Sequence, residues 1–153
     1  MRAVVLRIRP AQEADYEALA CVWGQGWLLT DPAAPSLPDD LLDQLRARIR
    51  HEMESGDWKL FAAEDEGIIV GMLAMKPGHL DQLFVAEDRR SHSIGKQLLD
   101  FAKIEMPQGF WLRTHNLNTG GHKFYEREGM VHARTEPHPR FPETIVRIYE
   151  WKP

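Results

Sequence analysis

The segment from Glu87 to Asp100, EDRRSHSIGKQLLD, carries the residue types that bind an anion. It is a short polar loop that opens directly into a helix with an apolar face. The first turn of a helix offers backbone N–H groups without intrahelical partners, and its dipole favours negative charge. Gly95 permits close approach to the backbone, and positive charge comes from Arg89, Arg90 and Lys96. The predicted occupant is a phosphate or pyrophosphate, although many α/β proteins contain such a turn without a ligand.

Two other polar residues have side chains that can transfer protons. His79 and Asp81 stand two positions apart in a strand pattern, so their side chains are expected on one face of the strand. An unperturbed histidine titrates at about 6.5 and takes up a proton at neutral pH, which makes His79 a candidate general base. The alternative is that His79 is a surface residue at the edge of the strand.

Length and composition are those of an ordinary globular protein. The chain has 153 residues, 43% hydrophobic and 27% charged, which indicates one domain at 1–153. Its 19 Lys and Arg against 23 Asp and Glu give a net charge of −4, which disfavours nucleic-acid and membrane partners. No apolar run has the length of a membrane span, and the start lacks the apolar core of a signal peptide. A single cysteine, Cys21, excludes an internal disulfide, so we expect a cytoplasmic protein with Cys21 in its core.

Hydrophobic periodicity and turn residues predict the elements that must hold these groups. Strands are expected at about 3–8, 58–64, 67–76, 80–86, 110–115, 130–134 and 144–151. Helices are expected at about 12–27, 39–55, 93–106 and 119–128, and the three prolines of 31–38 predict a loop. The consecutive middle strands imply antiparallel neighbours, whereas the strand–helix–strand unit at 80–115 should be parallel and right-handed. The predicted fold class is α/β, a mixed sheet of about seven strands with helices on both faces.

Two motifs in this frame resemble the Gcn5-related N-acetyltransferase (GNAT) superfamily. The family's loop pattern, Gln/Arg-x-x-Gly-x-Gly/Ala, reads here as Arg90-Ser91-His92-Ser93-Ile94-Gly95, with Val85 five residues before it. Its later pattern, Asn-x-x-Ala-x-x-Phe-Tyr-Glu-x-x-Gly-Phe, is met by Asn118, Phe124, Tyr125, Glu126 and Gly129, with Gly121 in place of Ala and Met130 in place of Phe. The specific resemblance runs from about Gly78 to Val131. It implies the GNAT fold and an N-acetyltransferase activity with acetyl-CoA as the donor.

The resemblance also implies which residues hold acetyl-CoA. Backbone N–H groups of the loop would bind the pyrophosphate, and the fourth strand would pair with the pantetheine arm, parting from the fifth strand after Val85. The implied cofactor-binding residues are Leu83, Phe84, Val85, Arg90, Ser91, His92, Ser93, Ile94, Gly95, Lys96 and Asn118. Asn118 has a second interpretation as a plain N-cap of the helix at 119–128, and both roles are compatible.

Serines replace two glycines that are common in the family's loop, at Ser91 and Ser93. Three interpretations of Ser93 follow. Its side chain crowds the phosphate or strains the turn, its hydroxyl caps the helix, or the hydroxyl donates to the phosphate.

The family's chemistry implies an acid, a base and an acceptor site. By resemblance, Tyr125 would donate a proton to the departing thiolate, and His79 would take the proton of the acceptor amine. The alternative for Tyr125 is a core tyrosine. Trp23 and Trp27, one helical turn apart, either pack in the core or line the acceptor pocket. The acceptor is a small-molecule or protein amine that the sequence does not identify.

The altered loop also allows a second function, a catalytically weak or inactive CoA-binding or interaction module of the same fold. We expect no metal, because His92, His115 and His122 fit no compact ligand spacing. The last strand, if exposed, would allow a homodimer in either case, because Tyr149 and Trp151 give it an apolar face that packs either within the chain or across subunits.

Overall fold

The fold follows the element order expected from the sequence. The computed structural model describes residues 4–30, 40–89 and 93–153, with only the backbone described at 27–30. In chain order the main elements are β1 (Arg7–Pro10), α1 (Tyr16–Thr30), α2 (Leu41–Ser55), β2 (Lys59–Asp65), β3 (Ile68–Lys76), β4 (His79–Val85), α3 (Ile94–Glu105), β5 (Phe110–His115), α4 (Thr119–Arg127), β6 (Val131–Pro137) and β7 (Ile145–Trp151). Short 3₁₀ turns at Glu13–Asp15 and Glu87–Arg89 precede α1 and follow β4. The loop predicted at 31–38 lies outside the described residues.

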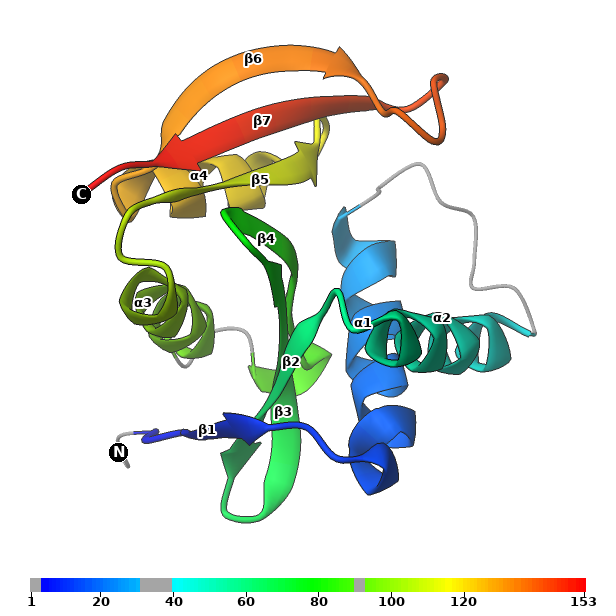
Figure 1. The fold of residues 1–153 in the computed structure, drawn as a ribbon. Coiled ribbons are helices and arrows are strands. Elements are labelled where there is room, and N and C mark those ends of the chain that lie inside the picture. Colours follow the sequence, from blue (N-terminus) through cyan, green and yellow to red (C-terminus); the bar gives the residue numbers. More distant parts are fainter. Residues whose placement is uncertain (1–3, 31–39, 90–92) are drawn as a thin grey trace.

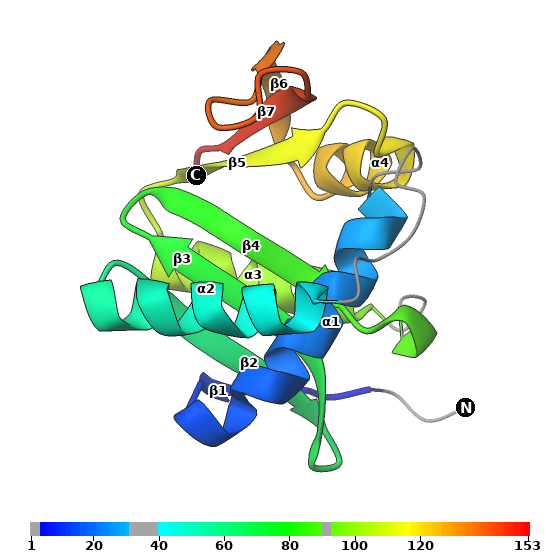
Figure 2. The same cartoon turned by 90° about the vertical axis from the view of Figure 1, so that its right-hand side faces the viewer.

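The strands of the described chain lie in one mixed sheet in the order β1-β2-β3-β4-β5-β7-β6. Neighbours are antiparallel except β4 and β5, which are parallel, as the strand–helix–strand pattern predicted. Helices α1 and α2 cover one face of the β1–β4 half and α3 covers the other, whereas α4 lies beside β5 and β7 (Figures 1 and 2). The predicted α/β class is confirmed. No helix in the described ranges has the length and apolar character needed to cross a bilayer.

The sheet opens between β4 and β5. These strands pair at one position, His79 with Trp111, and the Trp111 N–H donates to the Gly78 carbonyl at 3.1 Å. Beyond it, β4 stays paired with β3 as far as Val85, while β5 stays paired with β7 as far as His115. The two halves therefore diverge, as Figure 1 shows. The expectation that β4 parts from β5 after Val85 is wrong, because the strands part at the start of β4.

Both ends of the chain differ from the sequence prediction. The first strand was expected at 3–8 and before Pro10, but β1 runs from Arg7 to Pro10. Because β1 is an edge strand, the N–H that proline lacks is not needed by a neighbour. The chain before β1 is held instead by α3, where the Gln97 side chain accepts from the Leu6 N–H at 3.2 Å and donates to the Val4 carbonyl at 2.8 Å.

The last strand is internal, which corrects the expectation of an exposed one. β7 lies between β5 and β6, so β6 is the edge of the sheet. Tyr149 is fully buried and Trp151 is partly buried. The apolar face of β7 therefore packs within the chain, and a homodimer through an open β7 edge has no basis in this fold.

A glycine allows α1 to lie against β4. A Cβ atom built on Gly26 would stand 2.1 Å from Cδ1 of Phe84, far inside van der Waals contact. A Cβ on Gly24, one half-turn earlier, would meet Leu45 of α2 at an ordinary 3.6 Å. The absence of a side chain at Gly26 therefore fixes where the Phe84 ring can lie.

Replacing Gly26 by Ala should destabilise the fold by about 1–3 kcal/mol, because the new methyl group overlaps the Phe84 ring. The matched change Gly24→Ala should leave stability unchanged or raise it by up to about 1 kcal/mol, since alanine favours helix. Urea unfolding of both variants measures the difference. Equal effects of the two changes on stability would show that the Phe84 ring moves aside without a measurable cost.

Candidate functional site

Two cavities that share part of their lining begin at the split between β4 and β5: the smaller lies between these strands, and the larger lies between β4, α3 and α4. The larger, here called the groove, has a volume of about 690 Å³, and its lining includes Val85, Ser93, Gly95, Lys96, Lys123, Phe124, Arg127 and Glu128. The smaller, here called the pocket, has a volume of about 100 Å³, and its lining includes Leu80, Asp81, Gln82, Leu112, Arg113, Thr114 and His115. Four residues line both: Leu83, Phe84, Asn118 and Tyr125. The groove is large enough for an extended small molecule whose end would reach the pocket.

The start of α3 forms one end of the groove. Ser93 precedes the helix in the left-handed region at φ 59°, and its hydroxyl makes no capping hydrogen bond. Of the three interpretations of Ser93, the cap is therefore wrong, and backbone strain is present. Ile94 is fully buried, so only its backbone can reach a ligand. Arg90, Ser91 and His92 lie outside the described residues.

Two cations that the sequence assigned to the loop, Arg89 and Lys96, already have carboxylate partners. Lys96 Nζ lies 3.0 Å from Asp100 Oδ2 and 3.1 Å from Glu128 Oε1, and these hydrogen bonds raise the lysine pKa. Arg89, which was expected to add charge to the loop, donates to the buried carboxylate of Asp65 at 2.7 Å instead. An anion in the groove would have to compete with these carboxylates for Lys96.

Asn118 holds α4 against β5. Its Oδ1 accepts from the Gly121 N–H at 3.1 Å, which caps α4, and its Nδ2 donates to Thr114 Oγ1 at 3.0 Å. The N-cap interpretation is confirmed. A cofactor role for Asn118 stays a prediction, which its position in the lining of both cavities supports.

Tyr125 stands where the groove meets the pocket. Its ring packs against Phe124 at 5.2 Å and Tyr149 at 5.8 Å between centroids. The Tyr149 hydroxyl donates to Glu126 at 2.7 Å and so ties α4 to β7. A Cβ atom on Gly95 would stand 3.3 Å from Phe124, which explains why glycine suits that position of α3. The motif residues thus fix the orientation of the helix that carries Tyr125.

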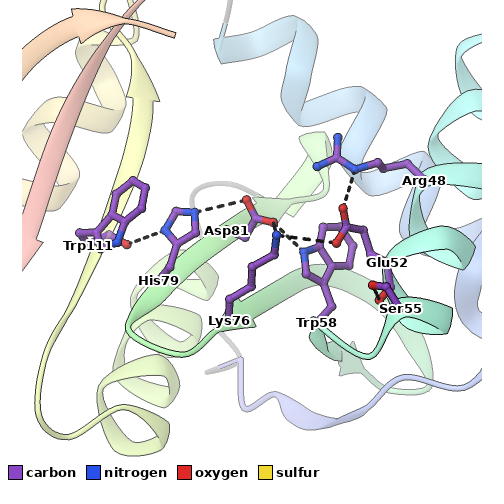
Figure 3. Close-up of polar contacts among 8 residues, drawn as sticks. All are labelled: Arg48, Glu52, Ser55, Trp58, Lys76, His79, Asp81 and Trp111. Carbon is purple, nitrogen blue, oxygen red and sulfur yellow. Dashed lines mark hydrogen bonds and ion pairs between the residues drawn. The ribbon is translucent and has the colours of Figure 1, made fainter. Parts of the chain in front are cut away.

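His79 bridges the two strands where they separate (Figure 3). Its Nδ1–H donates to the Trp111 carbonyl at 3.1 Å, and its ring stacks on the Trp111 indole at 3.8 Å. Its Nε2 lies 3.4 Å from Asp81 Oδ1, and only 13% of the His79 side chain is exposed. The surface-residue interpretation of His79 is therefore wrong, and the expected shared face of His79 and Asp81 is confirmed.

Asp81 is the extra residue of a β-bulge. Ala74 of β3 pairs with Gln82 and the next residue, Met75, pairs with Leu80, which leaves Asp81 without a partner across the ladder. Bulges of this kind re-aim side chains and are frequent beside active sites. Here the bulge turns the Asp81 carboxylate toward α2 and the Trp58 indole, whose Nε1 donates to Oδ2 at 2.6 Å.

Charges from α2 and β3 complete this network. Lys76 Nζ lies 3.9 Å from Asp81 and 3.8 Å from Glu52, and Glu52 also receives a hydrogen bond from Arg48 at 3.1 Å. Burial opposes ionisation of Asp81, but hydrogen bonds from His79 and Trp58, with the nearby positive charge, hold its pKa below the ordinary value. Asp81 is therefore a carboxylate at neutral pH.

Of the two tryptophans considered for an acceptor site, only the side chain of Trp23 is described, and it lies in the core. Trp23 is only 6% exposed, packs on Trp58 at 5.8 Å between ring centroids, and lines neither cavity, as its core interpretation proposed. The Trp27 side chain is outside the described part. Sequence reasoning missed Trp58 and Arg113. Alternation in FWLRTH carried a signal for Arg113, since it places Trp111 and Arg113 on one face.

The histidines considered as metal ligands make other contacts. His122 is buried, and its Nε2–H donates to the His115 carbonyl at 3.0 Å. Burial lowers the pKa of His122, so its ring is neutral. Within the described ranges, no group of three or more His, Cys, Asp or Glu side chains is arranged to hold a metal ion.

Comparison with known proteins identifies relatives of this chain. Residues 56–130 match the family described as the acetyltransferase (GNAT) domain. A Mycobacterium tuberculosis protein named "Probable N-acetyltransferase Rv2775" is 27% identical over 143 residues, covering 84% of this chain and 81% of the relative. An acetyltransferase from Thermus thermophilus has the same fold at a TM-score of 0.80 and 16% identity, covering 100% of both chains. PaiA N-acetyltransferase from Thermoplasma acidophilum, in complex with coenzyme A, superimposes at a TM-score of 0.73 and 20% identity, covering 97% of this chain and 99% of that one.

Replacing Asp81 by Asn should make the free energy of unfolding depend less steeply on pH in acid. Because folding lowers the pKa of Asp81, the carboxylate stabilises the fold above its unfolded pKa of about 3.9, and this contribution disappears as the pH falls through the folded value. Wild type should therefore lose stability more steeply than Asp81→Asn between about pH 5 and pH 2. Urea unfolding across that range measures it, with Asp43→Asn, whose side chain is 73% exposed, as the control. Parallel curves for wild type and Asp81→Asn would contradict the assignment.

Replacing Ser93 by Gly should raise stability by about 1 kcal/mol, because glycine adopts a positive φ without the steric cost that serine carries. The matched control is Ser93→Ala, which removes the hydroxyl and keeps the strained Cβ. Since the hydroxyl makes no cap bond, the alanine variant should not be stabilised. Thermal unfolding compares the three proteins, and a gain in both variants would assign the effect to the hydroxyl.

Proposed function

We propose that this chain, which matches the acetyltransferase (GNAT) domain family over residues 56–130, transfers the acetyl group of acetyl-CoA directly to a primary amine. The observation that carries this proposal is the meeting of groove and pocket at Tyr125. One long cavity would hold the donor and one short cavity the acceptor, with a proton-donating side chain at their junction.

The split in the sheet fits the amide-containing arm of coenzyme A. Within the described residues, β4 pairs with β5 only at His79, so its later backbone groups that face the split have no strand partner. Such groups require hydrogen bonds, and an extended amide chain beside Leu83, Phe84 and Val85 would provide them. Backbone N–H groups of Ser93–Lys96 at the start of α3 would bind the pyrophosphate. Bound there, acetyl-CoA supplies an activated acyl group.

Tyr125 is the proposed general acid. A tyrosine hydroxyl donates a proton at neutral pH. The packing of its ring against Phe124 and Tyr149 restricts its position at the junction. Protonation of the departing thiolate by Tyr125 would favour collapse toward products.

His79 is the proposed base, acting with Asp81. Because the Nδ1–H donates to the Trp111 carbonyl, Nε2 is the nitrogen that would take up and release a proton. A proton arriving at Nε2 would be stabilised by the Asp81 carboxylate, 3.4 Å away. Because Asp81 lines the pocket, its carboxylate would attract the ammonium form of the acceptor and relay the proton to His79.

Turnover should depend on Tyr125 far more than donor binding does. Tyr125→Phe should lower kcat by about 10²-fold and leave the acetyl-CoA-induced rise in melting temperature unchanged, because the phenyl ring keeps the packing. Tyr16→Phe, on α1 and outside both cavities, is the matched control and should behave as wild type. The assay follows release of free thiol from acetyl-CoA with a panel of amines, and His79→Ala should also reduce turnover more than binding.

Three results would contradict parts of this proposal. No thermal shift at millimolar acetyl-CoA would refute the donor site. A shift without turnover on any amine would favour the inactive CoA-binding module. Full kcat in Tyr125→Phe would remove Tyr125 as the acid.

A further inference from the structure

Arg113 is a cation in the wall of the pocket that lacks an anionic partner among the described residues. It lies in the middle of β5 and lines the cavity beside Asp81. Its Nε is buried and forms no hydrogen bond to any described group. No carboxylate in the described part of the chain pairs with its guanidinium, whose recorded contact is with the Trp111 ring at 5.0 Å.

Leaving the buried Nε–H of Arg113 without an acceptor is unfavourable for the fold, because an unsatisfied buried donor costs about 1–3 kcal/mol, and more when the group is charged. The Nε–H of other partly buried arginines of the sheet has an acceptor. Arg9 donates to Glu64 at 2.7 Å, and Arg147 donates to Asn116 at 3.2 Å. The arrangement at Arg113 therefore points to a partner that arrives with a ligand.

The surroundings of Arg113 select an anion. Burial lowers the pKa of His138, and the nearby charges of Arg113 on β5 and Arg140 in the β6–β7 loop lower it further, so positive charge gathers on this side. A guanidinium presents paired N–H donors that match the two oxygens of a carboxylate. A second ammonium group, as in a polyamine, would be repelled from the same position.

The β4 wall of the pocket has the reverse polarity. On this wall the Asp81 carboxylate is ionised and lies beside His79. His79 and Arg113 both contact the Trp111 indole, the His79 ring at 3.8 Å between centroids and Arg113 Cζ at 5.0 Å from the indole centroid. The pocket thus has a carboxylate on one wall and a guanidinium on the other, and a small molecule with both charges can contact the two.

We propose that Arg113 binds the carboxylate of the acceptor, which is therefore an amino-acid-type amine whose amino group lies toward Asp81. This inference rests on the proposed acetyltransferase function and adds the class of acceptor to it. Arg113 is then a specificity residue, because it holds the acceptor without exchanging a proton.

The test compares amino acids with the amines that lack their carboxylate. Probes are L-tryptophan with tryptamine, L-lysine with cadaverine, and L-leucine with isoamylamine, assayed by thiol release from acetyl-CoA. For at least one pair, wild type should prefer the amino acid by about tenfold or more in kcat/KM, because a site built to bind an anion rejects the analogue without it. Arg113→Met should reduce that ratio to about 1, mainly through KM, and Arg113→Lys should keep part of it.

A matched control and a second readout complete the design. Arg134→Met makes the same change on the exposed strand β6 and should keep the wild-type preference. Saturation-transfer NMR then measures binding of the same six probes to wild type and Arg113→Met, with and without CoA. Loss of the amino-acid signal in Arg113→Met supports the inference, even if no acceptor turns over.

The outcomes separate the two proposals. Absence of an acetyl-CoA thermal shift in wild type refutes the donor site, while the NMR comparison still decides the role of Arg113. Equal binding and turnover of both members of every pair, equal losses for both in Arg113→Met, or no carboxylate-dependent signal would each overturn the inference. Thermal unfolding confirms that the variant is folded.

Discussion

The site depends on the one position at which the two halves of the described sheet meet. The Trp111 N–H donates to the Gly78 carbonyl beside the paired residues His79 and Trp111, and the Trp111 carbonyl accepts from the His79 imidazole. This side-chain hydrogen bond and the stacking of the His79 ring on the Trp111 indole hold β4 and β5 together where their backbone pairing ends. The pocket lies in the gap that follows, and the groove continues from it between β4, α3 and α4.

The charged residues around His79 compensate one another and stabilise this junction. Burying the carboxylates of Asp81 and Glu52 is unfavourable, and Lys76, Arg48 and the Trp58 indole offset that cost. Removing one member would leave a buried charge unpaired, so the network constrains the ends of β3, β4 and α2 together. The same contacts orient the His79 ring and keep Asp81 ionised. The proposed proton transfer would thus use the hydrogen bonds that also stabilise the structure.

Sequence patterns predicted the elements better than their long-range partners. Alternation, helix stops and the Glu66-Gly67 turn are local, and the element order and α/β class they indicated are confirmed. The start of the split, the bulge at Asp81 and the internal position of β7 depend on contacts between distant segments, which periodicity does not encode. Ser93 illustrates the limit, because its residue type suits a cap, while its backbone lies in the left-handed region and its hydroxyl makes no capping bond. The roles of Tyr125, His79 and the cofactor residues remain predictions.

The two cavities differ in how their walls are encoded. The groove is lined by three short segments, 83–85, 93–96 and 118–128, which carry the motifs that were visible in the sequence and matched a known family. The charged residues of the pocket, Asp81 and Arg113, come from β4 and β5, and Lys76 and Glu52 surround Asp81 from β3 and α2. On the proposed function, donor binding would depend on short sequence motifs, whereas acceptor choice would depend on charges that folding brings together. For that reason an unpaired arginine in the pocket wall carries more information about the acceptor than the chain's net charge of −4. A summed charge averages over the surface, but an acceptor samples the few charges that line its cavity.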